Sequence, residues 1–271
     1  MPAKLSIGFL GSGRMATALA KGFVQAALVK PDQILGGDTV EEARVVFGRE
    51  VGARTTAFNP DVLKFATVLI LAVKPAQVPA VLKEVRGEIT EKHLLISIAA
   101  GIPLAKLEEG LETGARVVRV MPNLPAVVGA SASAFALGRS ATSEDGHLVQ
   151  RLLGAVGLAL QVPEPLLDAV TGLSGSGPAY VYLVIEALSD GAVAAGLPRD
   201  IATRLAAQTV IGAGKMVLET GLHTGALKDM VTSPGGTTIE GLHELEKAGV
   251  RGALMNAVRA AADKARKLGQ G

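Results

Sequence analysis

Short apolar runs alternate with amphipathic stretches along the first part of the chain, from Lys4 to about Gln161. The runs are continuously apolar and rich in Val, Ile and Leu, as expected of strands covered on both faces. They predict strands at residues 5–10, 33–35, 68–73, 94–98, 116–120, 132–137 and 159–161. The stretches between them predict helices at residues 14–28, 39–47, 60–65, 75–85, 103–109 and 142–156. This alternation indicates an α/β fold with a mainly parallel sheet and right-handed crossovers.

The pattern changes after Pro163 and Pro165, where strand signals end and long helical patterns begin. Helices are predicted at residues 166–171, 177–195, 199–220, 224–231, 237–247 and 250–267. We therefore expect a Rossmann-like domain over residues 1–163 and an all-helical domain over residues 164–271. About a hundred residues of Ala- and Gly-rich helices bury themselves incompletely. A second subunit is expected to complete the helical domain, which would make it a dimerisation domain.

The composition fits a globular protein of one large or two modest domains. Of the 271 residues, 49% are hydrophobic and 19% are charged, which argues against disorder. Aromatic residues make up 3% and Trp is absent, so the core must be built mainly from Ala, Val, Leu and Ile. The net charge is +2 and basic residues form no run, which argues against a nucleic-acid partner.

The chain contains no Cys, which excludes disulfides, thiol catalysis and thiolate metal sites. Met1 is followed by Pro2-Ala3-Lys4 and an apolar strand, without the leader pattern of a signal peptide. The longest apolar runs are too short to span a bilayer. We expect a cytoplasmic protein with no membrane partner and no metal site.

The first predicted strand leads into a glycine motif, Gly8-Phe9-Leu10-Gly11-Ser12-Gly13-Arg14-Met15-Ala16, and then a helix. Gly11 allows a tight turn, Gly13 lets the backbone approach a pyrophosphate, and Ala16 lets the helix pack on the strand. The N–H groups at the helix start then face the phosphates. An ordinary Gly-rich turn is the alternative. The position of the motif, at the start of a βαβ series, favours dinucleotide binding.

Asp38 follows the second strand, where an acidic residue would meet the adenosine ribose. Its carboxylate would accept hydrogen bonds from a 2′-hydroxyl and repel a 2′-phosphate. Alternatively, Asp38 caps the next helix with Glu41 as its capping-box partner. Arg44, on that helix, remains a candidate for receiving a phosphate. Both NADH and NADPH therefore stay open as the cofactor.

The carboxyl ends of parallel strands line the ligand crevice of such a sheet. Contacts to the cofactor are therefore expected where the strands at 68–73 and 94–98 end. The residues concerned are Ala72, Val73, Lys74, Pro75, Ala99 and Ala100. Pro75 also has a structural explanation, as the first residue of a helix.

Three further segments are too rich in Gly and Pro to be helix or strand: residues 119–125, 173–180 and 231–238. The last two open helices with a cluster of small residues, which is a ready site for an anion. A substrate carboxylate in such a site would gain up to ~2 kcal/mol from the helix dipole. The alternative is that Ser176 and Thr237 only cap these helices.

Together these motifs resemble those of the Δ1-pyrroline-5-carboxylate reductases, and the resemblance extends from the first strand to the last helix. It rests on residues 11–16, 72–75, 121–125, 174–179 and 227–238. Leu124 departs from the family pattern, which usually has Thr there. Asp38 stands where members that prefer NADPH often carry a small hydroxyl residue. The resemblance implies an oxidoreductase that uses NADPH or NADH to reduce the C=N bond of 1-pyrroline-5-carboxylate, giving L-proline in the last step of proline biosynthesis.

The resemblance also implies roles for individual residues. Thr238 would be catalytic and offer its hydroxyl to the imine nitrogen. The residues implied in substrate binding are Ser233, Gly235, Gly236, Thr237, Ser176, Gly177 and Met121. Those implied in cofactor binding are Gly11, Ser12, Gly13, Arg14, Met15, Asp38, Asn59, Ala72, Val73, Lys74, Pro75, Ala99, Ala100, Asn123 and Pro178. Family members form dimers through intertwined helical domains, and several dimers form a ring.

Two other functions share parts of this sequence pattern. A β-hydroxyacid dehydrogenase has a similar plan but needs a base, generally a Lys on the first long interdomain helix. No Lys occurs between Lys106 and Lys215, and His147 and His223 are poor substitutes. A non-catalytic nucleotide sensor would be expected to lose the loops at the substrate end, which are complete here.

Overall fold

The computed structural model of the chain describes residues 5–112 and 114–270. Contacts divide it into two compact units. The first unit runs to Ser176 and takes in the end of the last helix from Ala260, and the second runs from Gly177 to Arg259.

The first unit is built on an eight-stranded sheet in the order β3-β2-β1-β4-β5-β6-β7-β8. The strands are β1 (Ile7–Leu10), β2 (Ile34–Gly37), β3 (Arg54–Thr56), β4 (Val68–Leu71), β5 (Leu94–Ser97), β6 (Arg116–Met121), β7 (Ser131–Leu137) and β8 (Gly157–Gln161). The first six are parallel, β7 is antiparallel to β6, and β8 runs parallel to β7. The predicted mainly parallel sheet of a Rossmann-like domain is confirmed.

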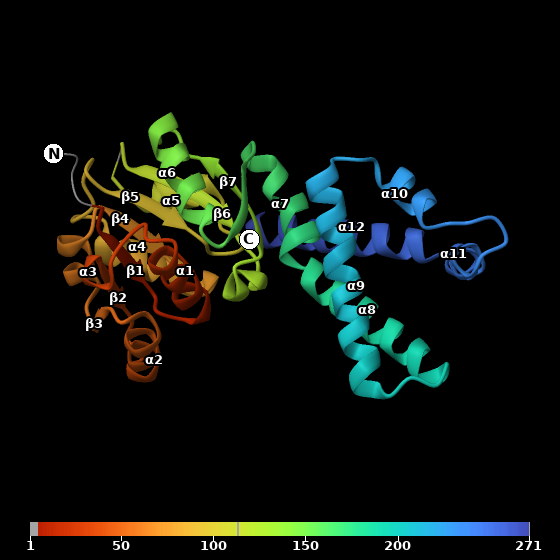
Figure 1. The fold of residues 1–271 in the computed structure, drawn as a ribbon. Coiled ribbons are helices and arrows are strands. Elements are labelled where there is room, and N and C mark those ends of the chain that lie inside the picture. The colour runs from red at the N-terminus through yellow and green to blue at the C-terminus, as the bar shows by residue number, and fades with distance from the viewer. Residues whose placement is uncertain (1–4, 113, 271) are drawn as a thin grey trace. The chain divides into compact units, whose positions relative to one another are not determined.

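Helices cover both faces of this sheet (Figure 1). One face is packed by α1 (Arg14–Gln25), α2 (Glu41–Val51) and α6 (Ser143–Gly154). The other is packed by α3 (Asn59–Phe65), α4 (Val78–Val85), α5 (Leu104–Glu109) and α7 (Leu167–Val170). Successive strand residues serve opposite cores: Phe9 packs with the α1 face and Leu10 with the α3 face. Burial on both sides explains why the strands are continuously apolar.

Several short helical turns complete the first unit. They are the 3-10 turns η1 (Pro31–Gln33), η2 (Pro75–Gln77), η3 (Leu124–Val128) and η4 (Glu164–Leu166), and the π turn η5 (Thr171–Gly175). The predicted helix from residue 75 thus begins as a 3-10 turn, and the helix predicted at 166–171 continues into the π turn.

The second unit consists of helices. They are α8 (Gly177–Ala194), α9 (Arg199–Thr220), α10 (Thr224–Met230), α11 (Thr237–Lys247) and the first half of α12 (Val250–Gln270). Within residues 177–259, all of which the structure describes, only Ser189, Ala202 and Ala206 are buried. The predicted all-helical C-terminal half is confirmed. Of the helices in the described ranges, none is long and apolar enough to cross a membrane.

The division by contacts falls later in the chain than the boundary predicted at residue 163. Leu167 in α7 is fully buried in the core of the first unit, and this short helix packs against β7. By contacts, residues 164–176 therefore group with the sheet. Ala262 and Ala265, near the end of α12, are also buried within the first unit.

Candidate functional site

The glycine loop between β1 and α1 has the backbone shape that its sequence predicts. Gly11 has φ +100°, and a Cβ there would come within 2.9 Å of the backbone of Ala72. At Gly13 the opposite holds, since no described heavy atom lies within 4 Å of the place a Cβ would take. Gly13 is the N-cap of α1, and Ala16 is buried beneath it. The loop therefore offers an open N-terminal cradle that fits a pyrophosphate.

The carboxylate of Asp38 fastens this loop to the end of β2. Its Oδ2 accepts a hydrogen bond from Ser12 N at 2.8 Å, and its Oδ1 accepts one from Val40 N at 2.9 Å. The capping-box alternative is wrong, because α2 begins at Glu41 and its N-cap is Val40, whose apolar side chain cannot cap. Arg44 donates from Nη1 to the carbonyls of Asp38 and Thr39, at 2.8 and 3.1 Å.

The ends of β4 and β5 lie on the same edge of the sheet as the glycine loop, because both strands run parallel to β1. Ala72 N donates to Leu10 O at 2.8 Å, which holds the end of β4 against β1. Ala72 and Val73 are half-buried and Ala99 is buried, whereas Lys74, Pro75 and Ala100 are exposed.

Asn59 is the first residue of α3, and its Nδ2 donates to Glu84 Oε2 of α4 at 2.7 Å. Both side chains are exposed or partly exposed at this helix pair. Arg14 and Met15, the other two expected cofactor contacts in this region, form the first turn of α1.

Two of the Gly/Pro-rich segments meet inside the first unit. Asn123, after β6, donates from Nδ2 to the carbonyl of Ser174 in the π turn at 2.9 Å. A Cβ on Gly175 would stand 2.6 Å from Met121 Cε, so the methionine packs directly on the glycine. Ser176 N closes the π turn by donating to Thr171 O at 2.9 Å.

The third segment forms a tight turn before α11. Gly235 has φ +65°, and Gly236 N donates to Ser233 O at 3.1 Å. A Cβ on Gly236 would come within 2.3 Å of Ser233 Oγ. Gly236 is the N-cap of α11, so Thr237 is its first residue and the alternative in which Thr237 caps the helix is wrong. Thr238, one residue further, is half-buried.

The two units hold different parts of the expected substrate set. Met121 and Ser176 belong to the first unit, whereas Gly177, Ser233, Gly235, Gly236 and Thr237 belong to the second.

His147 and His223, the two candidates for an alternative base, each belong to a helix or its cap. His147 lies within α6, and His223 is the N-cap of α10, where its Nδ1 accepts from Gly225 N at 3.1 Å.

Three exposed carboxylates, those of Glu50, Glu144 and Glu246, have a lowered pKa, caused mainly by hydrogen bonds. A hydrogen bond from Lys21, with a second from Arg49, lowers the pKa of Glu50. A hydrogen bond from Arg251 likewise lowers the pKa of Glu246, where α11 is followed by α12.

Two family models match the chain. Residues 6–101 match the model described as NADP oxidoreductase, coenzyme F420-dependent. Residues 164–268 match the model described as pyrroline-5-carboxylate reductase dimerisation.

Full-length relatives decide the family. The pyrroline-5-carboxylate reductase of Methanosarcina acetivorans is 51% identical over 264 residues, covering 97% of this chain and 98% of that protein. The chain belongs to the pyrroline-5-carboxylate reductase family. A second pyrroline-5-carboxylate reductase, from Glycine max, is 49% identical and covers 97% of this chain and 96% of its own length.

Solved structures of pyrroline-5-carboxylate reductases have the same fold. The enzyme of Coxiella burnetii superposes with a TM-score of 0.92 at 34% identity, and 98% of each chain is covered. The Plasmodium falciparum enzyme, solved with NADP bound, gives a TM-score of 0.88 at 33% identity with the same coverage. These matches support a pyrroline-5-carboxylate reductase over the β-hydroxyacid dehydrogenase alternative.

Some partners of the expected site residues were missed by sequence reasoning. Ser131 and Ser133 are buried in β7 and belong to the hydrogen-bond cluster around Asn123. Two serines at alternating positions of an otherwise apolar strand were the available signal, because buried hydroxyls need partners.

Proposed function

We propose that this chain reduces the cyclic imine 1-pyrroline-5-carboxylate to L-proline with NADPH or NADH, as the last step of proline biosynthesis. The observation that carries this proposal is the match at 51% identity over nearly the whole of both chains. The motifs of both units are included in that match, so the proposal does not rest on the Rossmann-like half alone.

The cofactor half of the proposal rests on the glycine loop and the neighbouring strand ends. Gly11, Ser12 and Gly13 would hold the pyrophosphate at the start of α1, where open space surrounds Gly13. Asp38 would face the adenosine ribose from the end of β2. When bound, the reduced nicotinamide supplies the hydride.

The substrate half rests on the turn before α11. Ser233, Gly236 and Thr237 would hold the carboxylate, since the first N–H groups of a helix lack intrahelical partners. The helix dipole would add up to ~2 kcal/mol in a partly buried setting. Thr238 would then place its hydroxyl beside the imine nitrogen.

The reaction requires little acid–base catalysis from the protein. A protonated imine already accepts a hydride at its carbon, and the electron pair of the C=N bond becomes the lone pair of the amine. The contribution of the chain is to orient the ring, exclude water and supply a hydrogen-bond partner at nitrogen. A hydroxyl such as that of Thr238 meets this need without an ionisable group.

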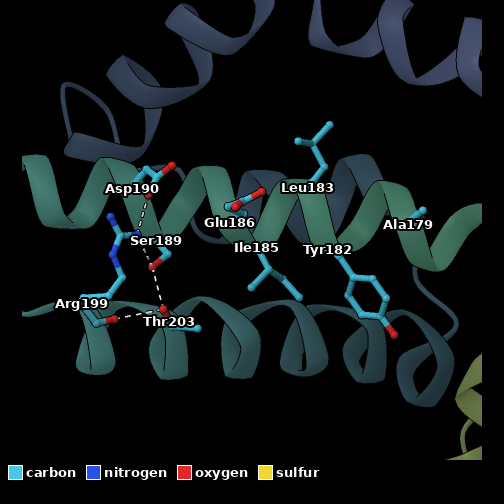
Figure 2. A pocket seen from close by; sticks show the side chains of 9 residues that line it. All are labelled: Ala179, Tyr182, Leu183, Ile185, Glu186, Ser189, Asp190, Arg199 and Thr203. Atoms are coloured by element: carbon cyan, nitrogen blue, oxygen red, sulfur yellow. Dashed lines mark hydrogen bonds and ion pairs between the residues drawn. The ribbon is translucent and has the colours of Figure 1, made fainter.

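The second unit supports self-association through its helices. Large apolar side chains of α8 and α9 are exposed, among them Leu183 and Leu218, at 66% and 76%. Figure 2 shows the groove between these helices, with Tyr182 and Ile185 directed toward α9 and Leu183 directed away from it. Ser189, Asp190 and Arg199 close one end of the groove with hydrogen bonds. A second copy of this chain is the proposed occupant, since the dimerisation model covers these helices.

The ring of dimers and the cytoplasmic location expected from the sequence stay predictions.

The test is an absorbance assay. Purified protein mixed with pyrroline-5-carboxylate and NADPH or NADH should consume the reduced nicotinamide and form proline. A 3-hydroxy acid with the oxidised cofactor serves as the matched reaction of a hydroxyacid dehydrogenase. Turnover of the hydroxy acid in place of the imine would overturn the proposal.

A further inference from the structure

Asn123 is a buried polar residue at the point where two loops of the first unit meet. Asn123 is the second residue after the end of β6, next to Pro122, and only 7% of its surface is exposed. The family resemblance implies that this residue contacts the cofactor. In the structure its amide group makes three hydrogen bonds within the chain.

The direction of these bonds is fixed by the backbone. Asn123 Oδ1 accepts from Ala132 N at 2.9 Å and from Ser131 Oγ at 3.1 Å. Because a backbone N–H can only donate, the oxygen of the amide must face Ala132. The nitrogen therefore faces the other way and donates to the carbonyl of Ser174 at 2.9 Å.

The carbonyl that receives this bond lies in the π turn Thr171–Gly175. Single π turns are found frequently at functional sites, because they break the regular helical hydrogen bonding. Ser174 Oγ donates to Val170 O at 3.1 Å, and Ser176 N donates to Thr171 O at 2.9 Å. Both bonds join the turn to earlier residues of the same helical segment. Asn123 holds it from the side, and Met121 packs on its Gly175.

We propose that Asn123 is a positioning residue for imine reduction, whose amide clamps the π turn to the loop after β6. The clamp fixes Met121 and Ser176, both assigned to the substrate, relative to each other. This inference rests on the proposed function. A displacement of the order of 1 Å in residues that orient a substrate is enough to cost about 100-fold in rate.

The informative variant is Asn123→Asp. It keeps the shape and the oxygen that faces Ala132, but it places a second oxygen opposite the Ser174 carbonyl. The expected result is a fall in kcat of about 10- to 100-fold, with the Kd for NADH or NADPH, measured by fluorescence, nearly unchanged. The amide of Ser176 should also exchange its hydrogen faster, as followed by mass spectrometry of the segment that contains it.

Ser133→Ala is the matched control. Ser133 lies one step further along the same buried cluster, with its Oγ 2.8 Å from Ser131 Oγ, and it does not bond to Asn123 or to the π turn. This variant should keep both kcat and the exchange rate of Ser176. If Asn123→Asp does not fold, Asn123→Ser takes its place, since its side chain is too short to reach Ser174.

Either of two results with an active protein would overturn the inference. One is an Asn123 variant that melts at a lower temperature but keeps its kcat when folded, which would make the residue merely structural. The other is a rise in the dinucleotide Kd as large as the fall in kcat, which would make Asn123 a direct cofactor contact. If the unaltered protein fails to reduce pyrroline-5-carboxylate, the proposed function fails. The exchange measurement still tests the clamp in that case. An unchanged hydrogen-exchange rate at Ser176 in Asn123→Asp would show that Asn123 does not hold the π turn.

Discussion

At the scale of single residues, the carboxylate of Asp38 has a structural role, and an electrostatic role toward the cofactor is proposed for it. Bonds from Ser12 N and Val40 N hold it in one orientation at the end of β2. With the ribose bound beside it, as proposed, a fixed charge there would act on whatever the ribose carries at its 2′ position. Two unit charges 4 Å apart interact by about 1 kcal/mol in bulk water and about 4 kcal/mol near a protein surface. The repulsion of a 2′-phosphate is therefore large enough to set the cofactor preference.

Asp38→Ser is expected to raise the ratio of kcat/KM for NADPH to that for NADH by about tenfold or more, since 1.4 kcal/mol corresponds to a factor of ten. The ratio is the right measurement because loosening of the glycine loop weakens both cofactors alike. Glu41→Gln removes an exposed carboxylate three residues away and is expected to leave the ratio unchanged. An unchanged ratio in Asp38→Ser would show that Asp38 does not determine the preference between NADPH and NADH.

Thr238→Ala is expected to lower kcat/KM for the imine by about 10- to 100-fold, with the melting temperature retained. The reason is the loss of a hydrogen bond to a charged group, worth about 1.5–3 kcal/mol. Thr238→Ser keeps the hydroxyl and should restore most of the activity. Kinetics that do not change in Thr238→Ala would remove this side chain from the mechanism.

At the scale of elements, the start of α11 is set by a glycine that leaves no room for a side chain. A Cβ on Gly236 would press on Ser233 Oγ at 2.3 Å, although its φ of −84° suits any residue. Glycine is therefore required at position 236 because the turn has no space for a side chain, and not because of the backbone conformation.

Gly236→Ala is expected to displace Ser233 and raise the KM for the imine several-fold, while the Kd of the dinucleotide stays the same. Gly241→Ala is the control, since among the described residues nothing lies within 4 Å of the Cβ it would gain in the middle of α11. That change should stabilise the helix by about 1 kcal/mol and leave the KM unaltered. Equal KM values for the two variants would argue against an anion site at this helix start.

The best-predicted element bounds are those marked by a residue such as Pro or Gly at the end of the element. The bounds of α9 agree with the prediction because Pro198 precedes the helix and Gly221, with φ +64°, ends it. By contrast, β3 was missed, since Arg54-Thr55-Thr56 carries no apolar pattern and is a strand only through its pairing with β2.

The same distinction holds for the candidate site. The glycine loop was predictable because the φ of Gly11 is a local demand. The role of Asn123 was not, because its partner Ser174 is 51 residues away in the sequence. A bond of that kind depends on how the loop after β6 meets the π turn η5, which no local pattern encodes.

At the scale of the whole molecule, the second unit lacks a core of its own. The three residues buried between 177 and 259 are Ser and Ala, whereas Leu and Ile side chains of α8 and α9 stay exposed. A unit of this size needs more buried apolar surface than its own helices provide. Its stability should therefore depend on protein concentration, as the stability of obligate dimers does.

Leu183→Glu is expected to convert the protein to monomers and to abolish most of its activity, because it places a charge on an apolar face of α8 that is 66% exposed in the single chain. Light scattering coupled to size-exclusion chromatography measures the change. Leu158→Glu makes the same substitution on β8 of the first unit, where the side chain is 48% exposed, and should leave the dimer intact. A dimer that survives Leu183→Glu would show that another face carries the contact.

Helix α12 begins in the second unit and ends in the first, where Ala262 and Ala265 are buried and Leu268 Cβ lies 3.5 Å from the place a Cβ on Gly101 would take. During synthesis, the sheet emerges from the ribosome long before this closing segment does. The first unit is therefore incomplete until the closing segment of α12 has been translated. Premature termination within α12 would thus leave unfinished a unit whose sheet was made first.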